Sequence, residues 1–207
     1  MNGRHLEIVR ALADSVRLLS VSQITKHWWT ETKWGRSRAR QAIRILEQDQ
    51  WLVTQTVMAR IVHEPVLPVV TWNMDDPEPD FQEVARTLHR RAIANATPIT
   101  VAIATRRAAA LFSSGPLATI KLTQVTHDLN VSELFLHFRG LGIPAQAWVS
   151  EDRLPADWPI RERPDAVLKN AAGTIYRAVE YGGDYPVSRL MELHRGISLL
   201  EIGYQIW

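Results

Sequence analysis

The amino-acid sequence predicts a mixed α/β protein with two domains and a connecting region. The 207-residue chain is 46% hydrophobic and 22% charged, which is ordinary for a globular protein with a buried core. Segments of helical periodicity alternate with short segments rich in β-forming residues. An acidic, proline-containing segment, residues 75–80, separates the first group of elements from the rest. We expect a first domain over residues 1–75, connecting elements over 76–125 and a second domain over 126–207.

The first domain is predicted to contain three helices followed by two strands. Ser20 or Ser22 is suited to cap the second helix, because a serine hydroxyl accepts a hydrogen bond from a free backbone N–H of the first turn. Three helices followed by a strand hairpin are typical of a winged helix-turn-helix, a module that binds double-stranded DNA. The helices are expected over residues 4–19, over 21–29 and from 36 onward, and the strands over 51–57 and 66–72.

The third helix is strongly basic. Arg36, Arg40 and Arg44 recur every four residues, so they form a stripe beside the apolar stripe of the same helix. Guanidinium groups in that arrangement can reach phosphates and guanine edges in the major groove. The alternative is a solvated basic helix in a protein–protein module. The expected DNA-contacting residues are Lys33, Arg36, Arg38, Arg40, Arg44 and, near the tip of the wing with His63, Arg60.

Charge is distributed unevenly along the chain. Residues 1–63 carry ten Lys or Arg and five Asp or Glu, net +5, whereas residues 64–207 carry fourteen and seventeen, net −3. A basic first third indicates a unit that faces nucleic acid. Chance clustering on a solvated surface would give the same numbers.

The connecting region is predicted to hold a helix and a strand. Residues 81–92 have an amphipathic helical pattern, and residues 98–105 have the apolar composition of a buried strand. Residues 106–112 fit either a strand or a helix, and Gly115-Pro116 indicates a turn.

The remaining elements follow the order α-β-β-β-α-β, which is the core order of the restriction-endonuclease-like fold. Gly173 is expected to make the turn between the second and third strands. The helices are expected over residues 128–140 and 187–199, and the strands over 145–150, 163–169, 174–180 and 201–207.

Two acidic residues fall where that fold holds a metal. Asp165 follows Pro164 at the second strand and Glu180 lies near the end of the third. In active members such carboxylates bind Mg²⁺, and a lysine two residues after the glutamate assists catalysis. Gly182 occupies that lysine position here, which favours a chain without nuclease activity. The residues that could complete an active site are Lys169 or Arg189 in place of the lysine, and Glu133 or Glu151 as a further metal ligand.

A simpler alternative is that both carboxylates are structural. Asp165 could pair with Arg161 or Arg163, and Glu180 with Arg177 or Arg189. His127-Asp128 fits a helix N-terminus, where a negative charge is favourable.

Four short motifs lie along the second half of the chain. They are Thr126-His127-Asp128-Leu129-Asn130, Trp148-Val149-Ser150-Glu151, Arg163-Pro164-Asp165-Ala166 and Ala178-Val179-Glu180-Tyr181-Gly182-Gly183. In this order they resemble the C-terminal signature of replication-relaxation family proteins. The resemblance implies a winged helix-turn-helix before a small α/β domain, and an association with replication, relaxation or transfer of plasmids and other mobile elements.

These observations predict a DNA-binding regulator or accessory factor of a mobile element, without a cofactor. A homodimer is expected, because one winged helix covers only a half-site. Two alternatives remain: a Mg²⁺-dependent nuclease using Asp165 and Glu180, and a module that recruits a relaxase or replication protein. The chain has no cysteine, no apolar run of membrane-spanning length and no secretory signal, so we expect a cytoplasmic protein without disulfides.

Overall fold

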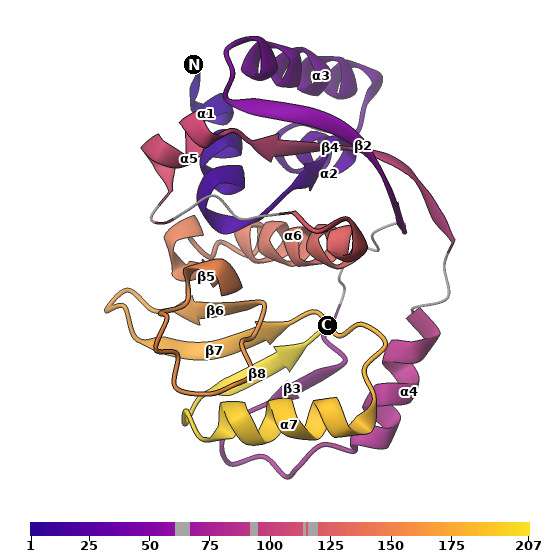
Figure 1. The fold of residues 1–207 in the computed structure, drawn as a ribbon, viewed down its shortest axis with the longest axis vertical. Coiled ribbons are helices and arrows are strands. Elements are labelled where there is room, and N and C mark those ends of the chain that lie inside the picture. Colours follow the sequence, from indigo (N-terminus) through magenta and orange to yellow (C-terminus); the bar gives the residue numbers. More distant parts are fainter. Residues whose placement is uncertain (61–66, 92–94, 114, 116–119) are drawn as a thin grey trace. The chain divides into compact units, whose positions relative to one another are not determined.

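The computed structural model describes residues 1–60, 67–91, 95–113, 115 and 120–207. It contains helices and two β-sheets, which confirms the predicted mixed α/β class (Figure 1). Contacts divide the chain into two compact units. Unit 1 consists of Met1–His63 and Asn95–Ala145, and unit 2 of Glu64–Ala94 and Gln146–Trp207.

This division differs from the predicted boundaries at residues 75 and 125. Each unit is built from two separate segments, so the chain passes between the units three times. The predicted boundaries assumed that each domain is continuous in sequence. Strand pairing over long sequence separations determines the observed division instead.

The helices of unit 1 begin at side-chain caps. Helix α1 (Gly3–Arg10) is capped by Asn2 and continues as a short π-helical segment (Ala11–Ser15). Helix α2 (Val21–Trp28) begins with a capping box, in which Ser20 Oγ accepts from the Gln23 N–H at 3.1 Å and Gln23 Oε1 accepts from the Ser20 N–H at 2.8 Å. Ser20, one of the two predicted caps, is therefore the cap used.

Helix α3 (Lys33–Gln48) begins three residues earlier than predicted. Thr32 Oγ1 accepts a 3.0 Å hydrogen bond from the Gly35 N–H and caps the helix. Gly35 is required there, because a Cβ atom at this position would overlap the carbonyl group of Thr30. The loop and the helix start thus depend on a close approach between two backbones.

Unit 1 contains a three-stranded antiparallel sheet in the order β1-β4-β2. Its strands are β1 (Leu19–Ser20), β2 (Leu52–Arg60) and β4 (Ala96–Ala104). The predicted hairpin between residues 51–57 and 66–72 is wrong. Strand β2 pairs with β4 along nine residues, from Leu52 opposite Ala104 to Arg60 opposite Ala96. The longer strand gives β2 a complete hydrogen-bonding partner, whereas β3 (Val70–Trp72) is only three residues long and joins the sheet of unit 2.

Two further helices complete unit 1. The ambiguous segment 106–112 is a helix, α5 (Arg106–Phe112), capped by Thr105. Helix α6 (Val125–Gly140), preceded by a 3₁₀ turn at Leu122–Gln124, packs Val125 and Leu129 into one core with residues of β2 and β4. The Gln23 side chain also donates to the Leu129 carbonyl at 2.8 Å, which ties α2 to α6. The predicted turn at Gly115-Pro116 lies partly outside the described residues.

Unit 2 contains a five-stranded sheet in the order β3-β8-β7-β6-β5. Strands β7 and β8 are parallel and the other neighbours are antiparallel. Gly173 has φ of +82° in the turn after β6, as its predicted turn position requires. The later strands are β5 (Trp148–Ser150), flanked by 3₁₀ turns at Ala145–Ala147 and Glu151–Arg153, β6 (Ala166–Lys169), β7 (Ile175–Glu180) and β8 (Gly203–Ile206).

Helices α4 (Phe81–Arg91) and α7 (Val187–Ser198) supply the apolar core of unit 2. Leu88 of α4 and Leu190 and Leu193 of α7 join Val167 and Tyr204 of the sheet in one buried cluster. The predicted order α-β-β-β-α-β is present as α6-β5-β6-β7-α7-β8, although α6 belongs to unit 1. Within the described residues, no helix is both long enough and apolar enough to span a membrane.

Candidate functional site

Helix α3 separates apolar from basic side chains by face. Its buried residues are small or aliphatic, and all five of its predicted DNA-contacting residues are exposed. This follows from the helical period of 3.6 residues, which gathers the apolar positions on one side. The buried residues are Gly35, Ala39, Ala42, Ile43 and Leu46, and the exposed basic residues are Lys33, Arg36, Arg38, Arg40 and Arg44.

The basic residues lie on two different flanks of α3. Arg36 and Arg40 line one cavity, whereas Arg38 lines another together with Trp34. The Arg38 guanidinium carbon lies 5.1 Å from the centroid of the Trp34 ring. The structure therefore brings Arg36 and Arg40 together and separates Arg38 from them.

The cavity beside Arg36 and Arg40 has a volume of about 390 Å³. Its walls come from the start of α2 at Ser20–Ser22 and from residues 98–100 of β4. Arg36 donates a 2.8 Å hydrogen bond to the carbonyl of Glu31, which directs the guanidinium along the loop before α3. Three elements thus surround a concave site that is lined by two cations and by one acidic residue, Glu31.

The basic stripe keeps its charge available to solvent. Within the described part of the chain, Lys33, Arg36, Arg40 and Arg44 form no ion pair. By contrast, Arg17 of unit 1 binds the buried carboxylate of Asp128 at 2.9 Å. Unpaired surface cations are suited to anionic partners, because no internal carboxylate competes for them.

Arg60 occupies the last position of β2 and is exposed. Its backbone N–H donates to Thr126 Oγ1 at 3.1 Å, which fixes the end of the strand on α6. His63, predicted to lie near it, is outside the described residues.

Asp165 and Glu180 lie together in unit 2, as their places on neighbouring strands predicted. Glu180 is only 2% exposed. Its Oε2 accepts from the Asp165 backbone N–H at 3.1 Å, and its Oε1 accepts from the Tyr185 hydroxyl at 2.7 Å. Asp165 Oδ2 accepts from the Tyr181 backbone N–H at 2.7 Å. The two carboxylates therefore bind the ends of β6 and β7 to the segment that follows β7.

The Tyr185 hydroxyl is a stable donor to Glu180. Burial raises the pKa of Tyr185 above its usual range, and the negative charges of Glu180 and Asp165 raise it further. Tyr185 therefore keeps its proton throughout the neutral range and can hold the Glu180 carboxylate by a charge-assisted hydrogen bond.

The other residues of the predicted active site are less close to this pair. Lys169 lies four residues beyond Asp165, roughly 13 Å along an extended strand, after an irregularity in the β6–β7 register. The guanidinium carbon of Arg189 lies 5.9 Å from the centroid of the Tyr185 ring, and its Nη1 is 3.6 Å from Glu162 Oε1. Of the two candidates for the lysine, Arg189 is therefore near the pair, through Tyr185.

Glu133, the further predicted metal ligand, belongs to α6 of unit 1. Its carboxylate lies 3.7 Å from Lys26 Nζ. Among the residues that the structure describes, no three histidine, aspartate or glutamate side chains are grouped as a metal site would require. The other candidate ligand, Glu151, starts the 3₁₀ turn after β5, and its backbone N–H donates to the Asp165 carbonyl at 2.8 Å.

Gly182, at the position of the missing lysine, faces the core. A Cβ atom there would lie 2.6 and 2.7 Å from the two methyl carbons of Leu88 and 2.9 Å from Cγ2 of Ile206. A longer side chain would therefore have to displace the packing of α4 and β8.

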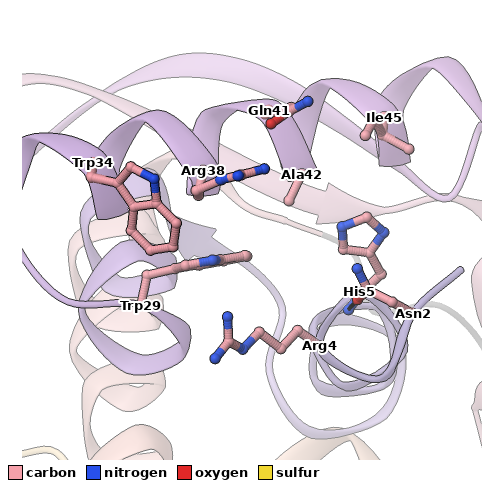
Figure 2. A pocket seen from close by; sticks show the side chains of 9 residues that line it. All are labelled: Asn2, Arg4, His5, Trp29, Trp34, Arg38, Gln41, Ala42 and Ile45. Atoms are coloured by element: carbon pink, nitrogen blue, oxygen red, sulfur yellow. Dashed lines mark hydrogen bonds between the residues drawn. The ribbon is translucent and has the colours of Figure 1, made fainter.

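Sequence reasoning missed the aromatic cavity on the other flank of α3. Its lining includes Trp29, Trp34 and Arg38 with Arg4 from α1 (Figure 2). The signal in the sequence was a tryptophan at an exposed position of a basic helix. Finding the cavity also required knowing that α1 packs beside α3.

Comparison with known proteins gives no match: no family model, no curated protein and no solved structure is significantly similar to this chain.

Proposed function

We propose that the chain binds double-stranded DNA through unit 1, with α3 in the major groove. The observation that carries this proposal is the exposed row of Arg36, Arg40 and Arg44 on a helix whose opposite side is buried. A helix of this kind fits the major groove, where guanidinium groups contact phosphates and guanine edges.

The topology of unit 1 supports a winged helix-turn-helix. Its helices and strands begin in the order α1-β1-α2-α3-β2-β4, before α5 and α6, and its sheet has the order β1-β4-β2. In this interpretation β2 and β4 are the two strands of the wing. Residues 98–100 of β4 line the same cavity as Arg36 and Arg40, so the wing and the helix would contact one stretch of phosphate backbone.

The charges of the two units support the same assignment. Unit 1 carries fourteen Lys or Arg and seven Asp or Glu, net +7, whereas unit 2 carries ten and fifteen, net −5. The two units therefore differ in net charge more than residues 1–63 and 64–207 do. A net positive unit attracts DNA at long range and an acidic unit does not.

For unit 2 we propose a role other than nuclease activity. The carboxylates of Asp165 and Glu180 are engaged by two backbone N–H groups and the Tyr185 hydroxyl. These bonds are those of a structural brace. The resemblance to replication-relaxation proteins extends the proposal: the chain would act as a regulator or accessory factor of mobile-element DNA, with unit 2 available to a protein partner.

The test is a fluorescence-anisotropy titration of labelled duplex DNA at several salt concentrations. The variant Arg36→Ala/Arg40→Ala/Arg44→Ala should lose most of its affinity. The slope of log affinity against log salt should fall by roughly 0.9 for each phosphate contact removed. The matched control removes three exposed arginines from α4, as Arg86→Ala/Arg90→Ala/Arg91→Ala, and should bind as the wild type does.

Either of two results would reject duplex binding by α3: no affinity in the wild type, or equal losses in both triple variants. The same samples, incubated with Mg²⁺ and run on a gel, test the nuclease alternative. Cleavage that Asp165→Ala abolishes would replace our proposal for unit 2.

A further inference from the structure

A second cavity in unit 1 lies on the flank of α3 opposite the Arg36–Arg40 cavity. It has a volume of about 320 Å³, and its walls come from α1, from the turn after α2 and from α3. Trp29 and Trp34 stand at one end and His5 at the other (Figure 2). Trp34 is 61% exposed, so burial in the core does not explain its position.

The two indole rings offer flat apolar surfaces at a place reached by solvent. Exposed tryptophan is unfavourable in water, and its ring face is well suited to stack on another planar ring. Nucleobases stack on such rings without regard to their sequence, because every base has a π-face. The rings thus favour a planar, aromatic ligand.

The charged groups of this cavity are cationic. The Arg4 guanidinium lies 5.7 Å from the centroid of Trp29, and the Arg38 guanidinium lies 5.1 Å from that of Trp34. None of the described residues that line the cavity is acidic. An aromatic cage for an ammonium group would require the opposite charge, so these arginines favour a ligand that is anionic as well as planar.

The polar groups at the cavity can read a base edge. The Gln41 side chain has an amide that donates and accepts, and Asn2 has an amide group that can donate while its Oδ1 caps α1. Burial lowers the pKa of His5 below its usual value, and the charge of the N-terminal amino group lowers it further. The imidazole is therefore neutral at pH 7 and has one donor and one acceptor nitrogen.

We propose that this cavity binds one nucleotide, with its base on Trp34 and its phosphate at Arg38 and Arg4. The volume is at the lower end of the range for small-ligand sites, roughly 300–1,000 Å³, which suits a single nucleotide. The nucleotide is either free or an unpaired residue of a DNA strand. The proposal does not depend on duplex binding, because Arg36 and Arg40 line the other cavity.

The experiment titrates the full chain with two probes. Isothermal titration calorimetry measures dAMP, and anisotropy measures a labelled single strand of six deoxyadenosines. Trp34→Ala should weaken binding by about tenfold or more, which is the usual effect of removing a base-stacking ring. Trp34→Phe keeps an aromatic face and should restore most of the affinity. Arg38→Gln should weaken dAMP binding and leave the weaker binding of adenosine, which has no phosphate, nearly unchanged.

Two controls separate this site from others. Tyr176→Ala removes an exposed aromatic ring of unit 2, and Arg86→Ala/Arg90→Ala removes two exposed cations of α4; both should bind dAMP and the single strand as the wild type does. If Trp34→Ala weakens both probes, the site accepts a free nucleotide. If it weakens only the single strand, the site takes an unpaired residue of DNA. The proposal is overturned if the wild type binds neither probe, or if Trp34→Ala binds both as tightly as the wild type.

Discussion

The backbone N–H of Asp165 donates to Oε2 of Glu180 at 3.1 Å, so the carboxylate of one strand end holds the backbone of its neighbour. The other oxygen, Oε1, accepts from Tyr185, and Asp165 Oδ2 accepts from the backbone of Tyr181. The arrangement closes a ring of hydrogen bonds around the end of β7. Opening this ring should therefore lower the stability of unit 2.

Tyr185→Phe removes the hydroxyl that donates to the buried Glu180 carboxylate. Loss of this donor at a buried charged acceptor should lower the free energy of unfolding by about 1–3 kcal/mol. Urea denaturation measures the change. Tyr176→Phe is the matched control, because Tyr176 is 39% exposed, and its stability should stay within about 0.5 kcal/mol of the wild type. Equal stability of both variants would show that the Tyr185–Glu180 hydrogen bond contributes nothing.

Gly182→Lys introduces the lysine that active members of the restriction-endonuclease-like fold have. The new Cβ would meet Leu88 and Ile206 at 2.6–2.9 Å, so we expect a loss of about 1–3 kcal/mol of stability and no Mg²⁺-dependent cleavage. Gly183→Ala is the control, since its Cβ would lie at an ordinary 3.7 Å from Tyr185. DNA cleavage by Gly182→Lys would contradict the structural role that we assign to Asp165 and Glu180.

Asp128→Ala removes the carboxylate that binds Arg17 at 2.9 Å, where the two side chains are 3% and 19% exposed. Removing one partner of a largely buried ion pair should destabilise unit 1 by about 3 kcal/mol. Glu133→Gln is the comparison, because the Glu133–Lys26 pair is longer, at 3.7 Å, and its lysine is 36% exposed. Its loss should cost at most about 1 kcal/mol. Thermal unfolding measures both losses of stability. A larger loss for Asp128→Ala than for Glu133→Gln would show that burial determines how much each ion pair contributes.

His194 gives unit 2 a pH dependence. Its ring lies against Trp72 and Phe81, its Nδ1 is 3.0 Å from the Tyr204 hydroxyl, and burial lowers its pKa below 6.5. The nearby Glu78 opposes this shift and Arg195 supports it. Because the folded state disfavours the proton, stability is fully present above pH 6.5 and falls as the pH drops toward the folded-state pKa.

His194→Gln should therefore reduce the slope of stability against pH between about pH 7 and pH 5. Urea denaturation at several pH values measures that slope. His5 and His27 of unit 1 have lowered pKa values as well, so some slope should remain in the variant. An unchanged slope would mean that His194 is protonated equally in the folded and unfolded states.

The sequence predicted elements that depend on nearby residues. The predicted serine cap, which is Ser20, depends on backbone within the next turn, and the turn at Gly173 requires a left-handed backbone that glycine adopts freely. The partner of β2 was predicted wrongly, because 35 residues separate Arg60 from Ala96 and strand composition does not record which strands pair.

The candidate sites were likewise predictable where they depend on one helix or on neighbouring strands, and not where distant segments meet. The helical period placed Arg36 and Arg40 on one side of α3, and the strand order placed Asp165 beside Glu180. The Trp34 cavity could not be predicted, because one of its walls comes from α1. Whether a carboxylate is braced or exposed to a ligand likewise depends on a distant donor such as Tyr185.

The pairing of β4 with β1 and β2 determines which fragments of this protein keep a complete sheet. Strand β4 is the central strand of its sheet, between β1 and β2, and it lies beyond residue 75. A fragment of residues 1–75 would therefore expose both of its remaining strands along an open edge and would be prone to aggregate. Removing residues 61–95 would leave the sheet intact. Arg60 of β2 and Ala96 of β4 are paired on neighbouring strands, so a two-residue Asn-Gly turn could join them. The two units are thus interleaved along the chain, and unit 1 becomes one continuous piece when a single turn replaces residues 61–95 and the chain ends at residue 145.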